Sequence, residues 1–306
     1  MDDELIMEDF STMWLYPDKA LIRPKGSKSL VPINVPFGLY SEIETAGKNK
    51  IAFKYKFLGE PCRVETVNSV NGKSFVIRKL MHNLKSLNEL GMSPKVIDKL
   101  LEPKLSGLVI FAGLQGVGKT TFGSALLLER IKRFGGSAQV LEDPPELDLD
   151  NVYENGIIQQ IDVHERNYTD LRSSEELGYF ASRALRADTD IVYLGEVLRS
   201  SEAKEVITHS GNGALIITTI HGGNLSLAIE RLINLAGTGS EFMLSTTLTA
   251  VIYLTLKPPL SSGRRVVEIL PLFCNMPVIR AAIREKNFNS LESFAQQQIS
   301  QILMEK

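Results

Sequence analysis

The sequence has few cysteines and no excess of basic charge. Its 306 residues include only Cys62 and Cys274, which are too few for a disulfide framework and lack metal-ligand spacing. A reduced, cytoplasmic setting is therefore expected. The 34 basic and 36 acidic residues leave a net charge of −2, so no overall basic field favours nucleic acid as a partner, although a local basic patch is compatible with this balance.

Long apolar runs are also missing. The longest are Leu108–Gly113, Ala214–Ile220 and Leu244–Leu256, and none reaches the roughly 18 residues needed to span a bilayer. The residues at positions 2 to 4 are acidic, which is the wrong sign of charge for a signal peptide. If the protein serves a membrane, we expect it to do so from outside the lipid.

The composition that is present is that of a globular protein, with 43% hydrophobic and 23% charged residues. At about 150 residues per domain, the length predicts roughly two domains. Residues 1–50 contain several prolines and few periodic runs, and we expect them to be loosely structured. From Ile51 to Leu80, apolar and polar residues alternate between turn signals at residues 59–61 and 71–72, which predicts a small antiparallel sheet.

The second part of the chain alternates short apolar runs with helical stretches. Gly107–Ala112 is typical of a strand buried on both faces, and a helix is expected from Lys119 to about Phe134, where two glycines follow. Further strands are expected at residues 138–141, 191–194 and 214–220. This alternation predicts an α/β fold with a mostly parallel sheet. We therefore predict an N-terminal domain with its linker over residues 1–84 and a second domain over residues 85–306.

One motif sits between the first strand and helix of that second domain. Residues 113–120 fit the phosphate-loop pattern GxxxxGK[ST], in the strand–loop–helix context that the motif requires. Its glycines let backbone N–H groups face phosphate oxygens, Lys119 is expected to reach the β- and γ-phosphates, and Thr120 is expected to offer its hydroxyl to Mg²⁺. The residues predicted to bind ATP here are Gly113, Gly116, Val117, Gly118, Lys119, Thr120 and Thr121.

Polar residues follow three other predicted strands. Glu142 and Glu146 come after the strand at 138–141, Glu196 after the strand at 191–194, and His221 after the strand at 214–220. Ligands of open parallel sheets bind at the carboxyl ends of the strands, so these side chains are predicted to converge on one nucleotide. Taken singly, each also fits an acidic turn, a helix start or a loop with a hydrogen-bonded imidazole.

With these motifs in order, the sequence resembles the PilT-like secretion and type IV pilus ATPases. The family's Asp box corresponds to residues 141–146, its Walker B region to 185–196 and its His box to 211–221. Residues 53–59 are more similar to the DotB/TraJ branch, whose members serve type IVB secretion and conjugation. The resemblance covers about residues 51–306 and leaves residues 1–50 outside it.

This resemblance implies a fold and a set of catalytic roles. The fold is a RecA-like P-loop ATPase domain preceded by a small α+β, PAS-like N-terminal domain. Glu146 would polarise the attacking water, Glu196 would support Mg²⁺, partly through water, together with Thr120, and His221 would sense the γ-phosphate. These are positioning and electrostatic roles, which dominate phosphoryl transfer.

The resemblance also implies partners. Members of the family form homo-hexameric rings on the cytoplasmic face of the inner membrane, attached through platform or secretion-channel proteins, and no direct contact with nucleic acid is expected. Basic residues of the N-terminal domain reach the γ-phosphate held by an adjacent subunit. Arg78 keeps the place of such a residue, whereas Lys54 and Lys56 stand where related proteins often show arginine.

Three departures from the family pattern concern residues outside the phosphate loop. Leu198-Arg199-Ser200 replaces the usual Arg-Asp after the Walker B glutamate, Ala214 replaces a histidine, and Ala281 replaces an asparagine. The nucleotide chemistry is thus expected to be intact while the coupling surfaces differ. The sequence does not tell pilus retraction from pilus assembly, secretion or conjugation.

Two other functions fit the same core. A nucleic-acid translocase would show hydrolysis stimulated by single-stranded DNA, but the balanced charge does not favour it. A nucleotide-binding scaffold with little turnover is suggested by the altered segment after Glu196, and a phosphate-release assay separates it from a motor.

Overall fold

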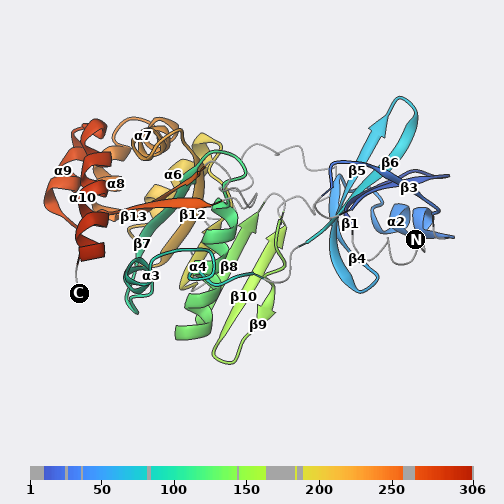
Figure 1. Cartoon of the computed structure of the whole chain (residues 1–306), viewed down its shortest axis with the longest axis horizontal. Coiled ribbons are helices and arrows are strands. Elements are labelled where there is room, and N and C mark those ends of the chain that lie inside the picture. The colour runs from blue at the N-terminus through green and yellow to red at the C-terminus, as the bar shows by residue number, and fades with distance from the viewer. Residues whose placement is uncertain are drawn as a thin grey trace. The chain divides into compact units, whose positions relative to one another are not determined.

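The computed structural model describes residues 10–24, 27–35, 37–80, 84–142, 145–162, 183–184, 189–257 and 266–304. These residues form two compact units (Figure 1). Most of the first unit comes from residues 10–80, and it also includes residues 145–148. The second unit is built mainly from residues 84–142, 149–161 and 189–304.

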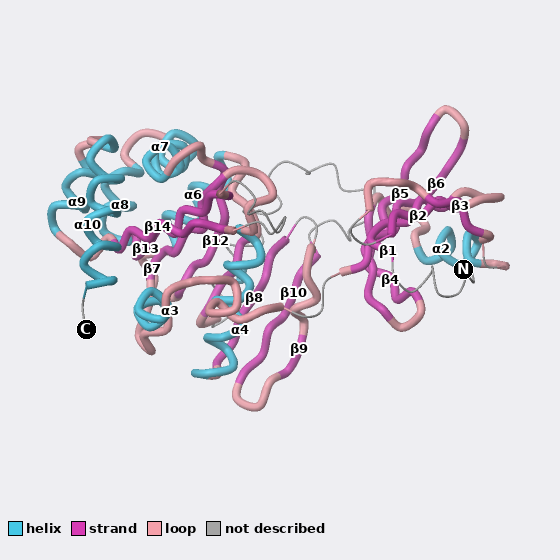
Figure 2. The backbone as a smooth tube through the Cα atoms, in the orientation of Figure 1, coloured by secondary structure: helices cyan, strands magenta, loops and turns pink. Residues whose placement is uncertain are grey.

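The first unit is a six-stranded sheet with the order β3-β2-β1-β6-β5-β4, and its paired strands are antiparallel. Figure 2 shows that this unit is mostly strand. Its core packs one sheet face against helix α2 and includes Met13, Ile43 and Phe75. The elements are β1 (Phe10–Leu15), β2 (Ala20–Pro24), β3 (Val31–Ile33), α2 (Leu39–Ala46), β4 (Ala52–Phe57), β5 (Glu60–Ser69) and β6 (Gly72–Lys79). The antiparallel sheet predicted between residues 51 and 80 is confirmed by β4, β5 and β6.

The expectation of a loosely structured N-terminus is wrong. Residues 10–46 supply half of the sheet's strands and the helix that covers it. Two features explain why the sequence pattern does not predict these strands. A register shift between Phe10 and Thr12 breaks the period-two alternation of β1, and Pro32 lies in the edge strand β3, where one side of the strand has no ladder to complete.

Residues 84–104 pack into the second unit. Helix α3 (Pro94–Leu100) supplies the helical character expected there, and Leu87 and Val96 are buried. The helix after the phosphate loop holds this segment, because Leu87 N donates to Glu129 Oε1 (2.6 Å) and Arg130 Nη1 donates to the carbonyl oxygen of Leu100 (2.8 Å).

The second unit contains an eight-stranded sheet with the order β14-β13-β7-β12-β11-β8-β10-β9. Strands β13, β7, β12, β11 and β8 run parallel to their neighbours in this series, which confirms the predicted mostly parallel sheet. β14 and β9 pair antiparallel at the two edges. The strands are β7 (Gly107–Gly113), β8 (Gly136–Glu142), β9 (Asn151–Val152), β10 (Gly156–Asp162), β11 (Ile191–Leu194), β12 (Leu215–His221), β13 (Leu248–Leu256) and β14 (Val267–Phe273).

Helices cover this sheet. All seven residues of β7 are buried, as expected for a strand covered on both faces. In the described part of the chain, no helix combines the length and apolarity required to cross a bilayer. The remaining elements are α4 (Lys119–Phe134), α6 (Ser200–His209), α7 (Leu225–Ala236), α8 (Ser240–Thr247), α9 (Pro277–Arg284), the 3₁₀ helix η1 (Phe288–Ser290) and α10 (Leu291–Met304). Helix α4 spans the residues predicted for it, from Lys119 to Phe134.

Helix α4 packs against the sheet at unusually close range in its second turn. A Cβ atom added to Gly123 would lie 2.7 Å from Cε2 of Tyr193, the fully buried tyrosine of β11. Such a distance is shorter than a carbon–carbon contact allows. Glycine at position 123 thus lets the phosphate-loop helix lie directly on an aromatic ring of the neighbouring strand.

Candidate nucleotide site

The phosphate loop depends on its glycines. Gly113, Gly116 and Gly118 have φ angles of 149°, 76° and 100°, a region that glycine adopts without steric cost. Gly113 is constrained twice, because an added Cβ would also lie 2.4 Å from the carbonyl oxygen of Leu254. The predicted loop therefore has a conformation that other residues at these positions would strain, and it leads directly into the first turn of α4.

Lys119 is the first residue of α4 and is 7% exposed. Its Nζ donates to the carbonyl oxygens of Gly113 (3.2 Å) and Leu114 (3.0 Å), so the lysine lies across its own loop. Thr120 and Thr121 follow it and are partly exposed, as a hydroxyl offered to a ligand must be. The loop residues predicted from the sequence are thus brought together at the carboxyl end of β7.

His221 joins this group from the neighbouring strand. It is the last residue of β12, in register with Gly113 of β7, and its Nδ1 lies 3.2 Å from Lys119 Nζ. Its Nε2 lies 2.9 Å from Oε1 of Glu196. If Nδ1 accepts the lysine proton, Nε2 carries the ring hydrogen and faces the carboxylate. The imidazole therefore links Lys119 of the phosphate loop to Glu196, the glutamate predicted for the Walker B region.

Glu196 stands on a turn fixed by two strands. The preceding Gly195 donates its N–H to the carbonyl oxygen of Leu141 in β8 (2.9 Å) and accepts the Thr219 hydroxyl of β12 at its own carbonyl (2.7 Å). Among the described residues, the buried Oε1 of Glu196 accepts no aligned hydrogen bond, although His221 approaches it closely.

A carboxylate oxygen that accepts no aligned hydrogen bond is suited to bind a hydrated Mg²⁺. This ion keeps several of its waters and needs few protein ligands. In the described ranges, no three His, Cys, Asp or Glu residues gather into a metal cluster of their own. The residues present thus fit an ion held by Thr120, Glu196, water and the phosphates of a substrate, which is how Mg²⁺ is usually bound beside nucleotides.

Two predicted motifs are only partly described. Residues 143–144 of the Asp box and 185–188 of the Walker B region lie outside the described residues. Glu146 is described, and it is an exposed residue of the segment that belongs to the first unit. Its predicted role in hydrolysis stays a prediction.

Several basic residues of the first unit form a row across one face of its sheet. Directly paired residues of neighbouring strands share a face, and the pairs Lys54–Arg63 and Arg63–Arg78 extend through Thr12 to Arg23. Lys56 lies on the same face as Lys54, two residues along β4. The sequence predicts a role for Arg78, Lys54 and Lys56, and the structure adds Arg63 to this group.

The register of two hairpins places Arg63 in this row. The turns at residues 58–59 and 70–71 are both two residues long, with Phe57 opposite Glu60 and Ser69 opposite Gly72. Counting back from these turns places Arg63 opposite both Lys54 and Arg78. The turn signals in the sequence, at residues 59–61 and 71–72, lie beside these turns and give a different register.

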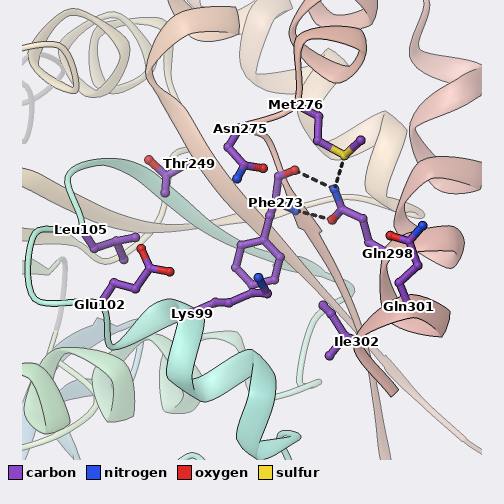
Figure 3. A pocket seen from close by; sticks show the side chains of 10 residues that line it. All are labelled: Lys99, Glu102, Leu105, Thr249, Phe273, Asn275, Met276, Gln298, Gln301 and Ile302. Atoms are coloured by element: carbon purple, nitrogen blue, oxygen red, sulfur yellow. Dashed lines mark hydrogen bonds between the residues drawn. The ribbon is translucent and has the colours of Figure 1, made fainter. Parts of the chain in front are cut away.

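A separate cavity of about 300 Å³ lies in the second unit, between α3, β14 and α10 (Figure 3). Gln298 forms part of its wall by accepting from Phe273 N (2.8 Å) and donating to Phe273 O (2.9 Å). The ammonium group of Lys99 lies 5.6 Å from the centre of the Phe273 ring. No residue of the phosphate loop lines this cavity, so it is distinct from the candidate nucleotide site.

The parallel sheet, the glycine-dependent loop and the buried lysine define a phosphate-loop protein of the α/β class. The model of the family described as "Type II/IV secretion system protein" matches residues 50–299. The chain belongs to this family, and the resemblance stated from its motifs is confirmed.

Curated relatives agree with this assignment. The chain is 29% identical to the type IV pilus ATPase PilU of Pseudomonas aeruginosa over 236 residues, which cover 75% of this chain and 58% of PilU. It is 28% identical to the PilT retraction ATPase of the same organism over 240 residues, covering 76% of this chain and 65% of PilT. The chain spans about 60% of the length of curated relatives to which it is similar in sequence.

Solved structures share the fold. The pilus retraction motor PilT with bound ADP gives a TM-score of 0.77 at 20% identity, covering 96% of this chain and 89% of that one. The ATPase DotB of Legionella pneumophila gives a TM-score of 0.74 at 17% identity, covering 98% and 85% of the two chains.

Proposed function

We propose that this protein hydrolyses ATP and that a six-subunit ring of it drives a type IV pilus or a type IV secretion machine. The observation that carries the proposal is the contact series from Lys119 through His221 to Glu196. It joins the carboxyl ends of β7, β12 and β11, where ligands of parallel sheets bind. Membership of the secretion family supports the same assignment.

Each residue of the series has a defined task in this proposal. Lys119 leaves its loop carbonyls to bind the β- and γ-phosphates, and Thr120 and Glu196 hold Mg²⁺, which neutralises charge on the phosphate oxygens when bound. His221 lies between the lysine and the glutamate, so it responds to a charge placed at either one. Glu146 orients the attacking water, a role that rests on the family resemblance.

We also propose that the subunits form a ring attached to the membrane through partner proteins. A heterologous interface closes into a ring when its rotation allows, and the basic row of the first unit would then act on a nucleotide bound by a neighbour. Light scattering in ATP, ADP and nucleotide-free buffer tests this assembly. A monomer under every condition would contradict it.

The activity itself is tested by phosphate release. Purified full-length protein is incubated with ATP and Mg²⁺, with and without single-stranded DNA, and Lys119→Ala serves as the blank. Steady phosphate release above the blank supports the motor. Binding of ATP without release favours the nucleotide-binding scaffold, and release that requires DNA favours the translocase.

A further inference from the structure

The side chain of Gln160 in β10 forms hydrogen bonds with two described residues of the second unit. It is 8% exposed, and its carboxamide is used at both ends. Its Oε1 accepts from the backbone N–H of Leu149 (3.2 Å), and its Nε2 donates to Oε2 of Glu142 (2.7 Å). Because a backbone N–H can only donate, the orientation of the amide is fixed, and Glu142 must receive the NH₂ side.

These two partners, Glu142 and Leu149, are the stems of one segment, that is, the residues of the second unit that directly precede and follow it, and the segment itself is assigned to the first unit. Glu142 is the last residue of β8, and the chain then passes from the second unit to the first. It returns to the second unit at Leu149. Gln160 therefore fastens the point of departure to the point of return, and the segment between them carries Glu146.

Glu142 also touches the turn before Glu196. A Cβ atom added to Gly195 would lie 3.0 Å from Cγ of Glu142, so the methylene groups of this buried glutamate pack against the Gly195 backbone. The same side chain is thus fastened to Gln160 at its carboxylate and pressed against the Walker B turn along its stem.

We propose that Glu142, Gln160 and Leu149 form a clasp, in which Gln160 is a positioning residue for hydrolysis. The clasp holds the stems of the segment carrying Glu146 and supports the turn carrying Glu196. This inference rests on the proposed function, since both glutamates act in the proposed reaction. Small displacements of such groups are costly, because a shift of about 1 Å can lower turnover by about 100-fold.

Three variants separate the clasp from a role of the Glu142 charge. Gln160→Leu keeps the volume and removes both hydrogen bonds. Glu142→Gln removes the charge, but its carbonyl oxygen still accepts from Gln160. The exchange variant, Glu142→Gln with Gln160→Glu, rebuilds both bonds, because the new glutamine donates and the new glutamate accepts from Leu149.

We expect turnover to fall when the hydrogen bonds of Gln160 are removed and to be higher in the variants that keep them. Gln160→Leu lowers kcat by about tenfold to 100-fold with little change in KM for ATP, while Glu142→Gln and the exchange variant, which keep the hydrogen bonds, lose less kcat than Gln160→Leu. Unchanged kcat in Gln160→Leu overturns the proposal. Equal losses in all three variants also overturn it, since the two variants that keep the hydrogen bonds would then be no more active than the one that lacks them.

A second measurement does not depend on activity. Hydrogen exchange at the Leu149 amide is expected to be slow in the wild type and in the exchange variant, and faster in Gln160→Leu. Equal exchange in all of them would exclude the clasp, whereas an intact clasp in a protein without ATPase activity would refute only the proposed function. If Gln160→Leu does not fold, Gln160→Asn replaces it, because the shorter side chain cannot reach both partners.

Discussion

The two units carry their charged residues in different ways. In the second unit, Lys119, His221 and Glu196 come from three strand ends that the parallel topology brings together. In the first unit, Arg78, Arg63 and Lys54 form a row set by the register of antiparallel strands. Side chains that meet at one site each make a different contact with the ligand, whereas the basic side chains of a row contribute together to one positive electrostatic field. We therefore expect single substitutions to be more damaging in the second unit.

The largest effect is expected for Lys119→Ala. Because the buried lysine is the cation of the phosphate loop, its loss should weaken ATP binding and reduce hydrolysis to background, with the loss of one such group alone costing about 100- to 1,000-fold. Phosphate release and binding of a fluorescent ATP analogue measure the two effects. Lys132→Ala, an exposed lysine of the same helix, is the control. Wild-type hydrolysis by Lys119→Ala would refute the phosphate-loop assignment.

Glu196→Gln and Glu146→Gln compare one carboxylate from each unit. Each keeps the shape and removes the charge, so ATP binding should persist while turnover falls, by about 100-fold or more for a positioned catalytic group. Single-turnover hydrolysis together with nucleotide binding checks both. Normal hydrolysis by Glu146→Gln would exclude its assignment and leave the chemistry to the second unit alone.

A smaller effect is expected in the basic row. Arg78→Ala should lower turnover by about tenfold, and Lys54→Ala and Lys56→Ala by less, because a lysine cannot grip phosphate with a planar fork. Arg63→Ala measures the residue that the register adds. Mixing Arg78→Ala with Lys119→Ala subunits tests action across the interface, since mixed rings regain sites with both wild-type residues. Full activity of rings built from Arg78→Ala alone would rule this role out.

The smallest effect concerns one cysteine in each unit. Burial raises the pKa of Cys62 to about 11 and that of Cys274 to about 12. Both thiols should therefore stay protonated and react slowly with a thiol reagent at pH 8, and react fast in denaturant. Because the pKa values are raised on folding, their contribution to stability is complete below about pH 8.5 and declines as the pH rises towards 11. Mass spectrometry of labelled peptides shows which unit opens first, and rapid labelling of both in the native protein would contradict the burial.

The sequence predicts the second unit better than the first for physical reasons. A strand buried on both faces, such as β7, reads as an unbroken apolar run, and the φ angles of the phosphate loop demand glycine. In the first unit, the register shift in β1 interrupts the alternation expected of a strand, and Pro32 in β3 argues against a strand there, so the sequence pattern predicts neither strand. The turn signals at residues 59–61 and 71–72 do not coincide with the turns at 58–59 and 70–71, so they do not give the register that places Arg63 beside Lys54 and Arg78.

The clasp could not be predicted in this way. Glu142 stands in the Asp box and was visible as a carboxylate at a strand end. Its partner Gln160 lies 18 residues away on a strand whose pairing no local pattern specifies. A glutamine at this distance has no signature in the sequence, because only the folded sheet makes its two partners neighbours.

The close packing of Gly123 on Tyr193 has a consequence for the evolution of this protein. An alanine at position 123 would place its Cβ against the tyrosine ring, so it can be accepted only after position 193 has become smaller. A large side chain at 193 is accepted only while position 123 remains glycine. We therefore expect that homologues with a large side chain at position 193 have glycine at position 123. We also expect that a side chain appears at position 123 only in lineages where position 193 has first become smaller.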